Sequence, residues 1–382
     1  MIDPPVSVER RNKRNNHTTK LSHTLDPKLR YAATARVLVS RRGLVVTTLL
    51  VNTRVIITGG AGFVGTILAR RLLAEPVSIG GAETAKVDEL TIADLVPPPA
   101  DVAADPRVKA VTGDLAAIVG QLGEADAIFH LAGVVSGAAE ADFDLGMHGN
   151  LDGTRAVLEH ARSHRTPPVL VFSSSLAVFG PVPGAEPIGV VGDDTLPRPL
   201  TSYGIQKFIG EQLVADYTRR GFVRGRSVRL ISVTVRPGKP NAAASSFMSG
   251  IIREPLAGLR APCPVPPDTP IAVSSPRRTL EGILRAAAVS DADWGPATAV
   301  TLPALTTTPR EMAAAMDQVA AASSPARTQP SDLIDWTEDP VIGAMVATWP
   351  AHVTATRAAA LGLEPDTSIA QIVREYLADL DR

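Results

Sequence analysis

Tyr203 and Lys207 are the residues of this chain whose types and spacing best suit catalysis. They lie four positions apart, so on a helix they share one face. A phenol normally ionises at a pKa of about 10, which is too high for a base at neutral pH. A neighbouring cation stabilises the phenolate and lowers that pKa. The pair therefore indicates a base that accepts the proton of an alcohol, or an acid that returns it to a carbonyl.

A glycine-rich turn lies upstream of this pair. The turn, residues 59–65, follows an apolar stretch at 54–58 that we expect to be a strand, and it opens a helical stretch at 63–74. Glycine allows a tight turn, close approach of the backbone to a pyrophosphate and close packing of helix on strand, and the helix N-terminus favours the anion. A tight turn without a ligand is the alternative. The predicted cofactor contacts here are Gly59, Gly62, Phe63, Val64 and Gly65.

Two acids end the next expected strands, 89–94 and 108–114. The Asp94 carboxylate can accept hydrogen bonds from an adenosine ribose and repels a 2′-phosphate, which favours NAD over NADP. Asp94 is further from the glycines than is usual, so we assume an insertion in the preceding loop; a solvated loop acid is the alternative. Asp114 and Leu115 could flank the adenine, although Asp114 could equally cap a helix.

Three consecutive serines, residues 173–175, end another expected strand. They lie on the sheet edge where a nicotinamide is expected, so a hydroxyl there can hydrogen-bond the reacting oxygen and hold it toward Tyr203. Serine runs also occur simply as loop residues. We nevertheless expect the run to complete the catalytic group.

Strand-like and helix-like stretches alternate from Thr53 onward, which is typical of a parallel sheet flanked by helices. We predict an α/β fold: a Rossmann-type doubly wound parallel sheet with a smaller mixed α/β C-terminal lobe. Residues 53–236 should bind NAD, and residues 237–382 should mainly bind substrate, with some segments returning to the first domain. Further expected elements are strands at 127–132, 168–173 and 226–235 and helices at 150–163 and 202–220.

The charges are unevenly distributed along the chain. Residues 1–54 hold eleven Lys/Arg and three Asp/Glu, and the remainder holds 27 basic and 36 acidic residues. An acidic body argues against nucleic acid as a partner. We expect residues 1–52 to be a disordered basic extension, either a non-essential segment from an upstream start codon or an Arg-rich targeting or nucleic-acid arm.

Other sequence features bear on membrane association, cellular compartment and metal binding. The apolar run 43–51 is too short to span a bilayer, so no membrane partner is expected. Cys263 is the single cysteine, which excludes an intrachain disulfide and favours a cytoplasmic protein. The seven histidines are scattered without metal-ligand spacing, so we predict no metal.

Together, these motifs resemble the short-chain dehydrogenase/reductase superfamily, in its extended or atypical branch, the NAD-dependent epimerase/dehydratase family. The resemblance implies that Tyr203 transfers the proton, that Lys207 binds the nicotinamide ribose and lowers the phenol pKa, and that Ser175 is the catalytic serine, with Ser174 near the substrate. Phe179 departs from the usual Tyr-Gly of this segment. The stretch from His130 resembles the family segment beside the cofactor, which implies contacts from Leu131, Ala132 and Gly133.

The segment 235–258, with 275–278 and 301–305, resembles the subfamily that oxidises D-erythronate, a four-carbon sugar acid, at C2. The resemblance implies oxidation to 2-oxo-tetronate, and places Pro237 beside the nicotinamide carboxamide. The implied substrate contacts are Ser174, Ser175, Asn241, Ser245 and Arg278. Relatives often pair, so a homodimer is expected.

The substrate type can also be argued from charge. A substrate carboxylate needs a cation, ideally an arginine, and the candidates are Lys239, Arg253, Arg277 and Arg278. The same cations could bind the diphosphate of a nucleotide sugar, so an epimerase or dehydratase with tightly bound NAD is the alternative. A redox-sensing binding protein on this fold is disfavoured, because such proteins commonly lack the Tyr/Lys pair.

Overall fold

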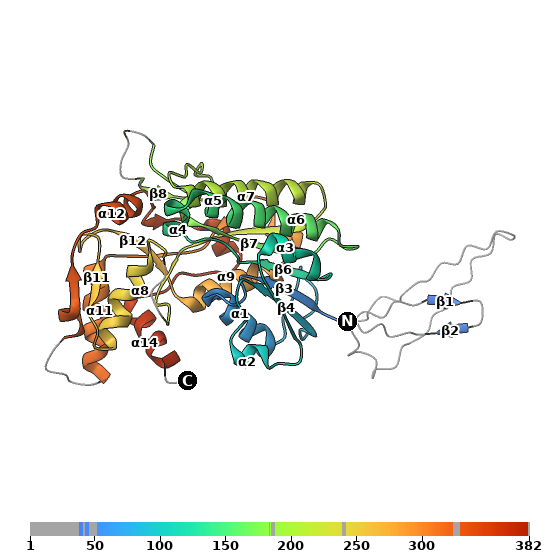
Figure 1. Cartoon of the computed structure of the whole chain (residues 1–382), viewed down its shortest axis with the longest axis horizontal. Helices are drawn as coiled ribbons and strands as arrows, with labels where there is room; N and C mark the ends of the chain where they lie inside the picture. The colour runs from blue at the N-terminus through green and yellow to red at the C-terminus, as the bar shows by residue number, and fades with distance from the viewer. Residues whose placement is uncertain are drawn as a thin grey trace, which may run out of the picture. The chain divides into compact units, whose positions relative to one another are not determined.

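The chain divides into two compact units, residues 1–52 and 53–382. The computed structural model describes residues 52–182, 184, 188–238, 242–323 and 329–380, together with two short strands of the first unit. These strands, β1 (Leu38–Ser40) and β2 (Gly43–Val45), pair antiparallel (Figure 1). The expected disordered extension at 1–52 otherwise lies outside the described residues.

A seven-stranded parallel sheet forms the centre of the second unit. Its order is β13-β9-β7-β6-β3-β4-β5, and every neighbouring pair is parallel. The chain runs outward from β3 to β5 and then returns to β6 on the other side of β3, so the winding reverses between β3 and β6. Ligands bind at the carboxyl ends of strands at such a reversal. The strands are β3 (Arg54–Thr58), β4 (Glu89–Asp94), β5 (Val108–Thr112), β6 (Ala127–His130), β7 (Val169–Ser175), β9 (Arg224–Leu230) and β13 (Val300–Thr301).

Successive side chains of a strand point to opposite faces of the sheet, and helices cover both of these faces. In β3, Val55 and Ile57 join one hydrophobic cluster, whereas Ile56 joins the other. The first cluster receives α1 (Phe63–Ala74) and α9 (Pro276–Ala288), and the second receives α3 (Leu115–Ile118), α6 (Gly153–Arg162) and α7 (Ser202–Arg219). Figure 1 shows α6 and α7 on one side of the sheet and α1 on the other. The predicted doubly wound α/β fold is therefore confirmed.

The helix α7 begins where its sequence can cap it. Thr201 is the N-cap and its side chain accepts a hydrogen bond from the Gly204 N–H. A Cβ at Gly204 would lie 2.2 Å from the Ala177 carbonyl oxygen, so only glycine lets the helix approach the end of β7 this closely. The first turn of α7 is thereby held against the residues that follow Ser175.

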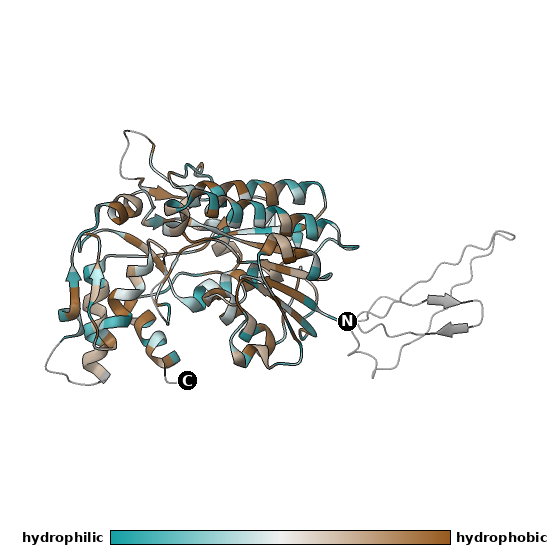
Figure 2. Ribbon diagram, in the orientation of Figure 1, coloured by the Kyte–Doolittle hydropathy of each residue, from teal (hydrophilic) through white to brown (hydrophobic). Residues whose placement is uncertain are grey.

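A third hydrophobic cluster lies away from the large sheet. It is formed by α8 (Ser246–Leu256), β11 (Ala261–Cys263), β12 (Ile271–Ser274), α11 (Pro309–Ser323) and α14 (Ile369–Leu380). In Figure 2 these helices carry both hydrophobic and hydrophilic colour, as expected of elements with one buried face. No helix in the described ranges is long and apolar enough to span a membrane.

The strand expected at 226–235 is two strands. The first, β9, ends at Leu230 in the large sheet. The second, β10 (Ser232–Val233), pairs with β12 in a three-stranded sheet that also contains β14 (Leu305–Thr307). The chain changes partner at Ile231, which is buried, whereas Ser232 and Val233 are half-buried.

The remaining elements are short and connect those already named. They are α2 (Ala100–Ala103), α4 (Ser136–Ala141), α5 (Phe143–Gly146), a π-helix (Met147–Asp152), β8 (Val190–Val191), α10 (Asp291–Trp294), β15 (Ile334–Trp336), α12 (Pro340–Ala347), β16 (His352–Val353), α13 (Thr356–Ala360) and 3-10 turns at Val119–Gln121, Leu176–Val178 and Pro330–Leu333.

Candidate active site

A cavity of about 540 Å³ lies at the carboxyl ends of the parallel strands. That volume is in the usual range of cofactor and substrate sites. At one end it is bordered by the residues that follow β4 and β5, and at the other by β7, α7 and the segment after β9. The predicted site residues that line it are Gly59, Gly62, Phe63, Val64, Gly65, Asp94, Asp114, Leu115, Leu131, Ala132, Gly133, Ser174, Ser175, Tyr203, Lys207 and Ser245.

The glycine turn forms a cradle that side chains would fill. Gly59 has a φ of +72°, and a Cβ there would lie 2.5 Å from the Ala132 nitrogen. A Cβ at Gly65 would lie 2.2 Å from the Gly59 carbonyl oxygen. At Gly62 the nearest atom would be that oxygen at 3.3 Å, and the rest of the space is open. Gly62 is the N-cap of α1 without a side-chain cap, so the first N–H groups of the helix are available to an anion. The turn therefore fits the pyrophosphate of a dinucleotide.

Two carboxylates border the cavity beyond β4 and β5. Asp94 accepts hydrogen bonds from the N–H of Ala61 at 2.9 Å and of Leu95 at 2.7 Å, so it also holds the glycine turn to β4. Each carboxylate oxygen has a further lone pair for a ribose hydroxyl. Asp114 caps α3 and lies 2.8 Å from Nε2 of His148, and this hydrogen bond lowers the pKa of Asp114.

Tyr203 and Lys207 lie in the first two turns of α7, facing Ser175 at the end of β7. The Lys207 ammonium donates a hydrogen bond of 2.8 Å to the Ser173 carbonyl and lies 5.7 Å from the centroid of the Tyr203 ring. Burial lowers the pKa of Lys207 to about 8. The fold thus brings together a phenol, an ammonium and a hydroxyl that are up to 32 positions apart in the sequence (207 − 175).

Three effects act on the Tyr203 phenol. Burial raises its pKa, whereas the interaction with the Ser175 side chain and the positive charge of Arg236 both lower it. Arg236 is thus a cation that acts on the phenol in addition to Lys207, to which the sequence analysis assigned this lowering. Arg236 lines the cavity and was missed by the sequence analysis, although it directly precedes Pro237 in the segment that carries the subfamily resemblance.

Ser174 is supported by a buried ion pair. Its hydroxyl donates to the Glu211 carboxylate, which also accepts two hydrogen bonds of 2.8 Å from the Arg229 guanidinium. All three side chains are buried. The pair therefore anchors the end of β7 to both α7 and β9, and part of the hydrogen-bonding capacity of Ser174 is directed toward the protein.

The segment after β6 is held by His130 and Asn150. The His130 ring lies within hydrogen-bond distance of the Thr58 hydroxyl at 2.7 Å and the Thr154 hydroxyl at 2.9 Å, and burial lowers its pKa to about 3. The Asn150 amide accepts from the Val134 N–H and donates to the Val134 carbonyl. These neutral contacts fix the backbone of residues 131–134 along the cavity.

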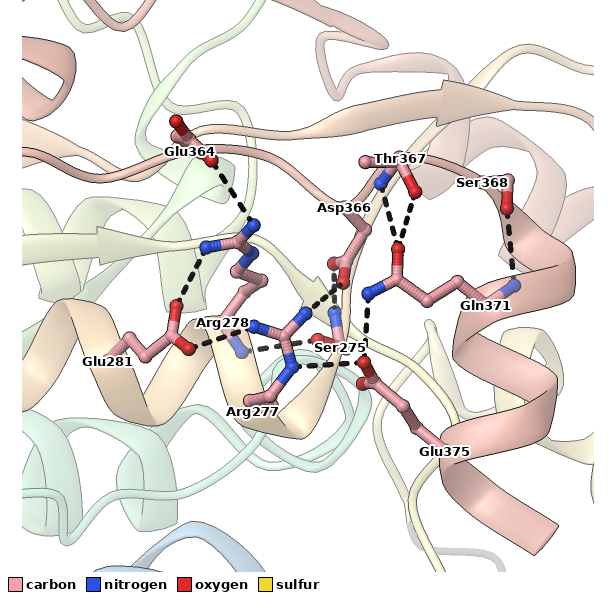
Figure 3. Close-up of polar contacts among 10 residues, drawn as sticks. All are labelled: Ser275, Arg277, Arg278, Glu281, Glu364, Asp366, Thr367, Ser368, Gln371 and Glu375. Atoms are coloured by element: carbon pink, nitrogen blue, oxygen red, sulfur yellow. Dashed lines mark hydrogen bonds and ion pairs between the residues drawn. The ribbon is translucent and has the colours of Figure 1, made fainter. Parts of the chain in front are cut away.

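The other predicted contacts lie elsewhere. Pro237 is exposed and does not line the cavity, and Asn241 and Lys239 lie outside the described residues. Arg278 is also away from the cavity, because its guanidinium pairs with Glu281 and Glu364 (Figure 3).

The remaining predicted cations are paired with protein groups as well. Arg277 pairs with Glu281 and Glu375, next to Arg278 (Figure 3). Arg253 pairs with Glu254 and donates to the Arg236 carbonyl. Of the cations proposed from the sequence, those in the described ranges are neutralised by carboxylates of the chain.

Comparison with known proteins agrees with this geometry. Residues 55–269 match the NAD dependent epimerase/dehydratase family. A D-erythronate dehydrogenase of Cupriavidus necator is 46% identical over 329 residues, covering 85% of this chain and 98% of that protein. A D-erythronate dehydrogenase of Haemophilus influenzae is 37% identical over 328 residues, with the same coverage of 85% and 98%. The solved structure of a nucleoside-diphosphate-sugar epimerase from Agrobacterium tumefaciens has a TM-score of 0.76 and 36% identity, covering 86% of this chain and 94% of that one.

The fold and the glycine cradle define a dinucleotide-binding enzyme of the Rossmann type. The chain belongs to the NAD-dependent epimerase/dehydratase family. The predictions of this family, of an NAD-dependent oxidoreductase and of NAD as the cofactor are confirmed.

Proposed function

We propose that the chain is a sugar-acid dehydrogenase that oxidises the C2 hydroxyl of D-erythronate, giving 2-oxo-tetronate. The observation that carries the proposal is the meeting of Tyr203, Lys207 and Ser175 in one cavity beside the glycine cradle. The choice of substrate is supported by two relatives named D-erythronate dehydrogenases, which this chain matches over nearly their whole length.

In the proposed reaction, the C2 hydroxyl of the substrate lies between Ser175 and Tyr203. Ser175 donates a hydrogen bond that orients the oxygen, and Tyr203 accepts the hydroxyl proton. The Ser175 side chain and the Arg236 charge make this easier, because they lower a phenol pKa that burial raises. When bound, NAD⁺ supplies the redox chemistry by taking up the hydride from C2. The alcohol thus loses one proton and one hydride and becomes a ketone.

The residues proposed to hold the cofactor follow the cavity from end to end. The cradle and the N-terminus of α1 would bind the pyrophosphate, and Asp94 would bind the adenosine ribose and exclude a 2′-phosphate. Lys207 would bind the nicotinamide ribose. We propose that residues 53–236 mainly bind NAD, and that residues 237–382 mainly bind substrate, since Ser245 and Trp349 of the second part also line the cavity.

The test is Tyr203→Phe, which removes only the phenolic oxygen. It should abolish NADH formation from D-erythronate while NAD⁺ binding, measured by fluorescence titration, stays within about twofold of the wild type. Tyr217→Phe is the matched control, because Tyr217 lies on the same helix and bonds Glu159 away from the cavity. A Tyr203→Phe variant with wild-type turnover would refute the assigned base.

The alternative is a nucleotide-sugar epimerase with tightly bound NAD, which the name of the Agrobacterium tumefaciens relative favours. The two differ in what accumulates. A dehydrogenase given free sugar acid releases NADH in proportion to the product. An epimerase given a UDP-sugar forms the isomeric sugar without net NADH, so a panel of four-carbon sugar acids and UDP-sugars separates them.

A further inference from the structure

Arg236 places a positive charge in the cavity without a carboxylate partner in the described part of the chain. Its backbone is fixed on both sides: its N–H donates to the Ser249 hydroxyl at 3.0 Å, and its carbonyl accepts from the Arg253 guanidinium at 2.7 Å. The charged groups that act on its guanidinium are Arg253 and Tyr203, and burial lowers its pKa. The position of the residue is therefore set by the protein, while the charge at its tip is not neutralised there.

Other arginines of the second lobe differ from Arg236 in this respect. Five of them lie within ion-pair distance of an acid: Arg253 with Glu254, Arg260 with Asp335, Arg277 with Glu281 and Glu375, Arg278 with Glu281 and Glu364, and Arg310 with Asp268. The Arg357 guanidinium instead donates to the Thr298 hydroxyl and to backbone carbonyls, and Arg285 and Arg374 are exposed. Arg236 is half-buried, and a charge that is partly removed from water without a partner is costly. Such a charge is expected where a ligand supplies the anion.

The location of Arg236 favours an anion other than the cofactor pyrophosphate. Arg236 follows β9 and β10 and borders the end of the cavity that contains Ser175 and Tyr203. The glycine cradle follows β3, which is three strands from β9 in the sheet. At about 4.8 Å per strand, the cradle lies roughly 14 Å from the end of β9. The anion that Arg236 can reach therefore belongs to a molecule beside the catalytic phenol.

We propose that Arg236 binds the substrate carboxylate, and that it is the residue by which the enzyme selects a 2-hydroxy acid. The inference rests on the proposed function. In a 2-hydroxy acid, the carboxylate is bonded directly to the carbon that is oxidised, so one cation next to Tyr203 can hold the acid and align its hydroxyl with the base. The guanidinium fork matches a carboxylate in two parallel hydrogen bonds, which fixes orientation as well as charge.

This assignment gives Arg236 two separable effects. Its fork geometry determines carboxylate affinity, and its charge lowers the Tyr203 pKa. Arg236→Lys keeps the charge and loses the fork, so KM for the acid should rise about 10-fold while the pH dependence of kcat changes little. Arg236→Met loses both, so KM should rise further, by up to about 100-fold, and the basic pKa of the kcat profile should move to higher pH.

The experiment compares D-erythronate with D-erythronamide, its uncharged analogue. Binding of each compound to the NAD⁺-loaded full-length protein is measured by calorimetry, and NADH formation is measured in parallel. The wild type should bind the acid at least about 10-fold more tightly than the amide, and Arg236→Met should bind the two about equally. Arg310→Met is the matched control, since Arg310 is an exposed arginine paired with Asp268.

The outcomes distinguish this inference from the proposed function. Equal binding of acid and amide by the wild type, or an acid preference that survives in both Arg236 variants, would overturn the inference. An acid preference that depends on Arg236 without NADH formation would support the anion site and refute the proposed reaction. Dependence of UDP-sugar binding, rather than acid binding, on Arg236 would overturn the carboxylate assignment in favour of a diphosphate.

Discussion

Glu211 should contribute strongly to the stability of the catalytic end of the sheet. The side chains of Arg229 and Glu211 are 6% and 2% exposed, and two hydrogen bonds of 2.8 Å join them. Glu211 lies four residues after Lys207, so it continues the helical face that carries Tyr203 and Lys207. Its removal leaves the Arg229 charge buried and the Ser174 hydroxyl without its acceptor.

The substitution Glu211→Gln tests this role because it removes the charge and nearly preserves the shape. Breaking a buried ion pair by removing one partner costs about 3–5 kcal/mol, so we expect that loss in the free energy of unfolding. Replacing both partners, with Glu211→Leu and Arg229→Met, removes the unpaired charge. Only the Ser174 hydroxyl then lacks a partner, at a cost of about 1–3 kcal/mol, so the double variant should be more stable than Glu211→Gln.

Urea unfolding followed by tryptophan fluorescence measures these free energies. The exposed pair Arg310–Asp268 is the control, since Asp268→Asn should leave the free energy of unfolding unchanged within experimental error. A loss of less than about 1 kcal/mol in Glu211→Gln, or a double variant that is less stable than Glu211→Gln, would refute this role of the ion pair.

Three further predictions concern the cofactor cradle and the buried histidine. Gly62→Ala should fold with wild-type stability but bind NAD⁺ about 10-fold or more weakly. Gly65→Ala should lose both stability and NAD⁺ binding, because its Cβ would meet the Gly59 carbonyl oxygen at 2.2 Å. Melting temperatures and NAD⁺ titrations check this, and equal behaviour of the two variants contradicts it. Asp94→Asn should raise kcat/KM for NADP⁺ relative to NAD⁺ by about 10-fold or more, because the repulsion of the 2′-phosphate is lost; an unchanged ratio argues against Asp94 as the ribose ligand. His130 has a folded pKa of about 3, and the unfolded chain takes up that proton below about pH 6.5. Its contribution to stability is complete above that pH and falls by about 1.4 kcal/mol per unit as the pH drops toward 3, so His130→Asn should flatten the stability profile between about pH 6.5 and 5, as measured by urea unfolding.

Much of the fold and of the cofactor site was predictable because it depends on local pattern. The strand before Gly59 and the helix after it are read from consecutive residues, and a backbone turn that only glycine can make is visible as glycine. The spacing of Tyr203 and Lys207 places both on one helical face without knowledge of any other element. These features suffice for a dinucleotide fold with a base beside the cofactor.

Which arginine lacks an acidic partner depends on the tertiary structure and not on local sequence pattern. Arg277 and Arg278 have the right residue type, but Glu375 and Glu364, 98 (375 − 277) and 86 (364 − 278) positions away, fold against them and neutralise their charge (Figure 3). Arg236 is free because no acid of the described chain is placed beside it. Sequence spacing carries no information about such distant partners.

The sequence by itself therefore determined the fold class and the cofactor, and it predicted the phenol proposed as the base, since each depends on a short run of residues with its own conformational preference. Only the tertiary structure decided that Arg236 lies in the cavity and acts on the Tyr203 pKa, and that Ser174 is bonded to Glu211. The physical reason is that charge and hydrogen bonding depend on which groups are close in space. That proximity is set by the packing of α7, β7 and β9 together, and by the segment that follows β10.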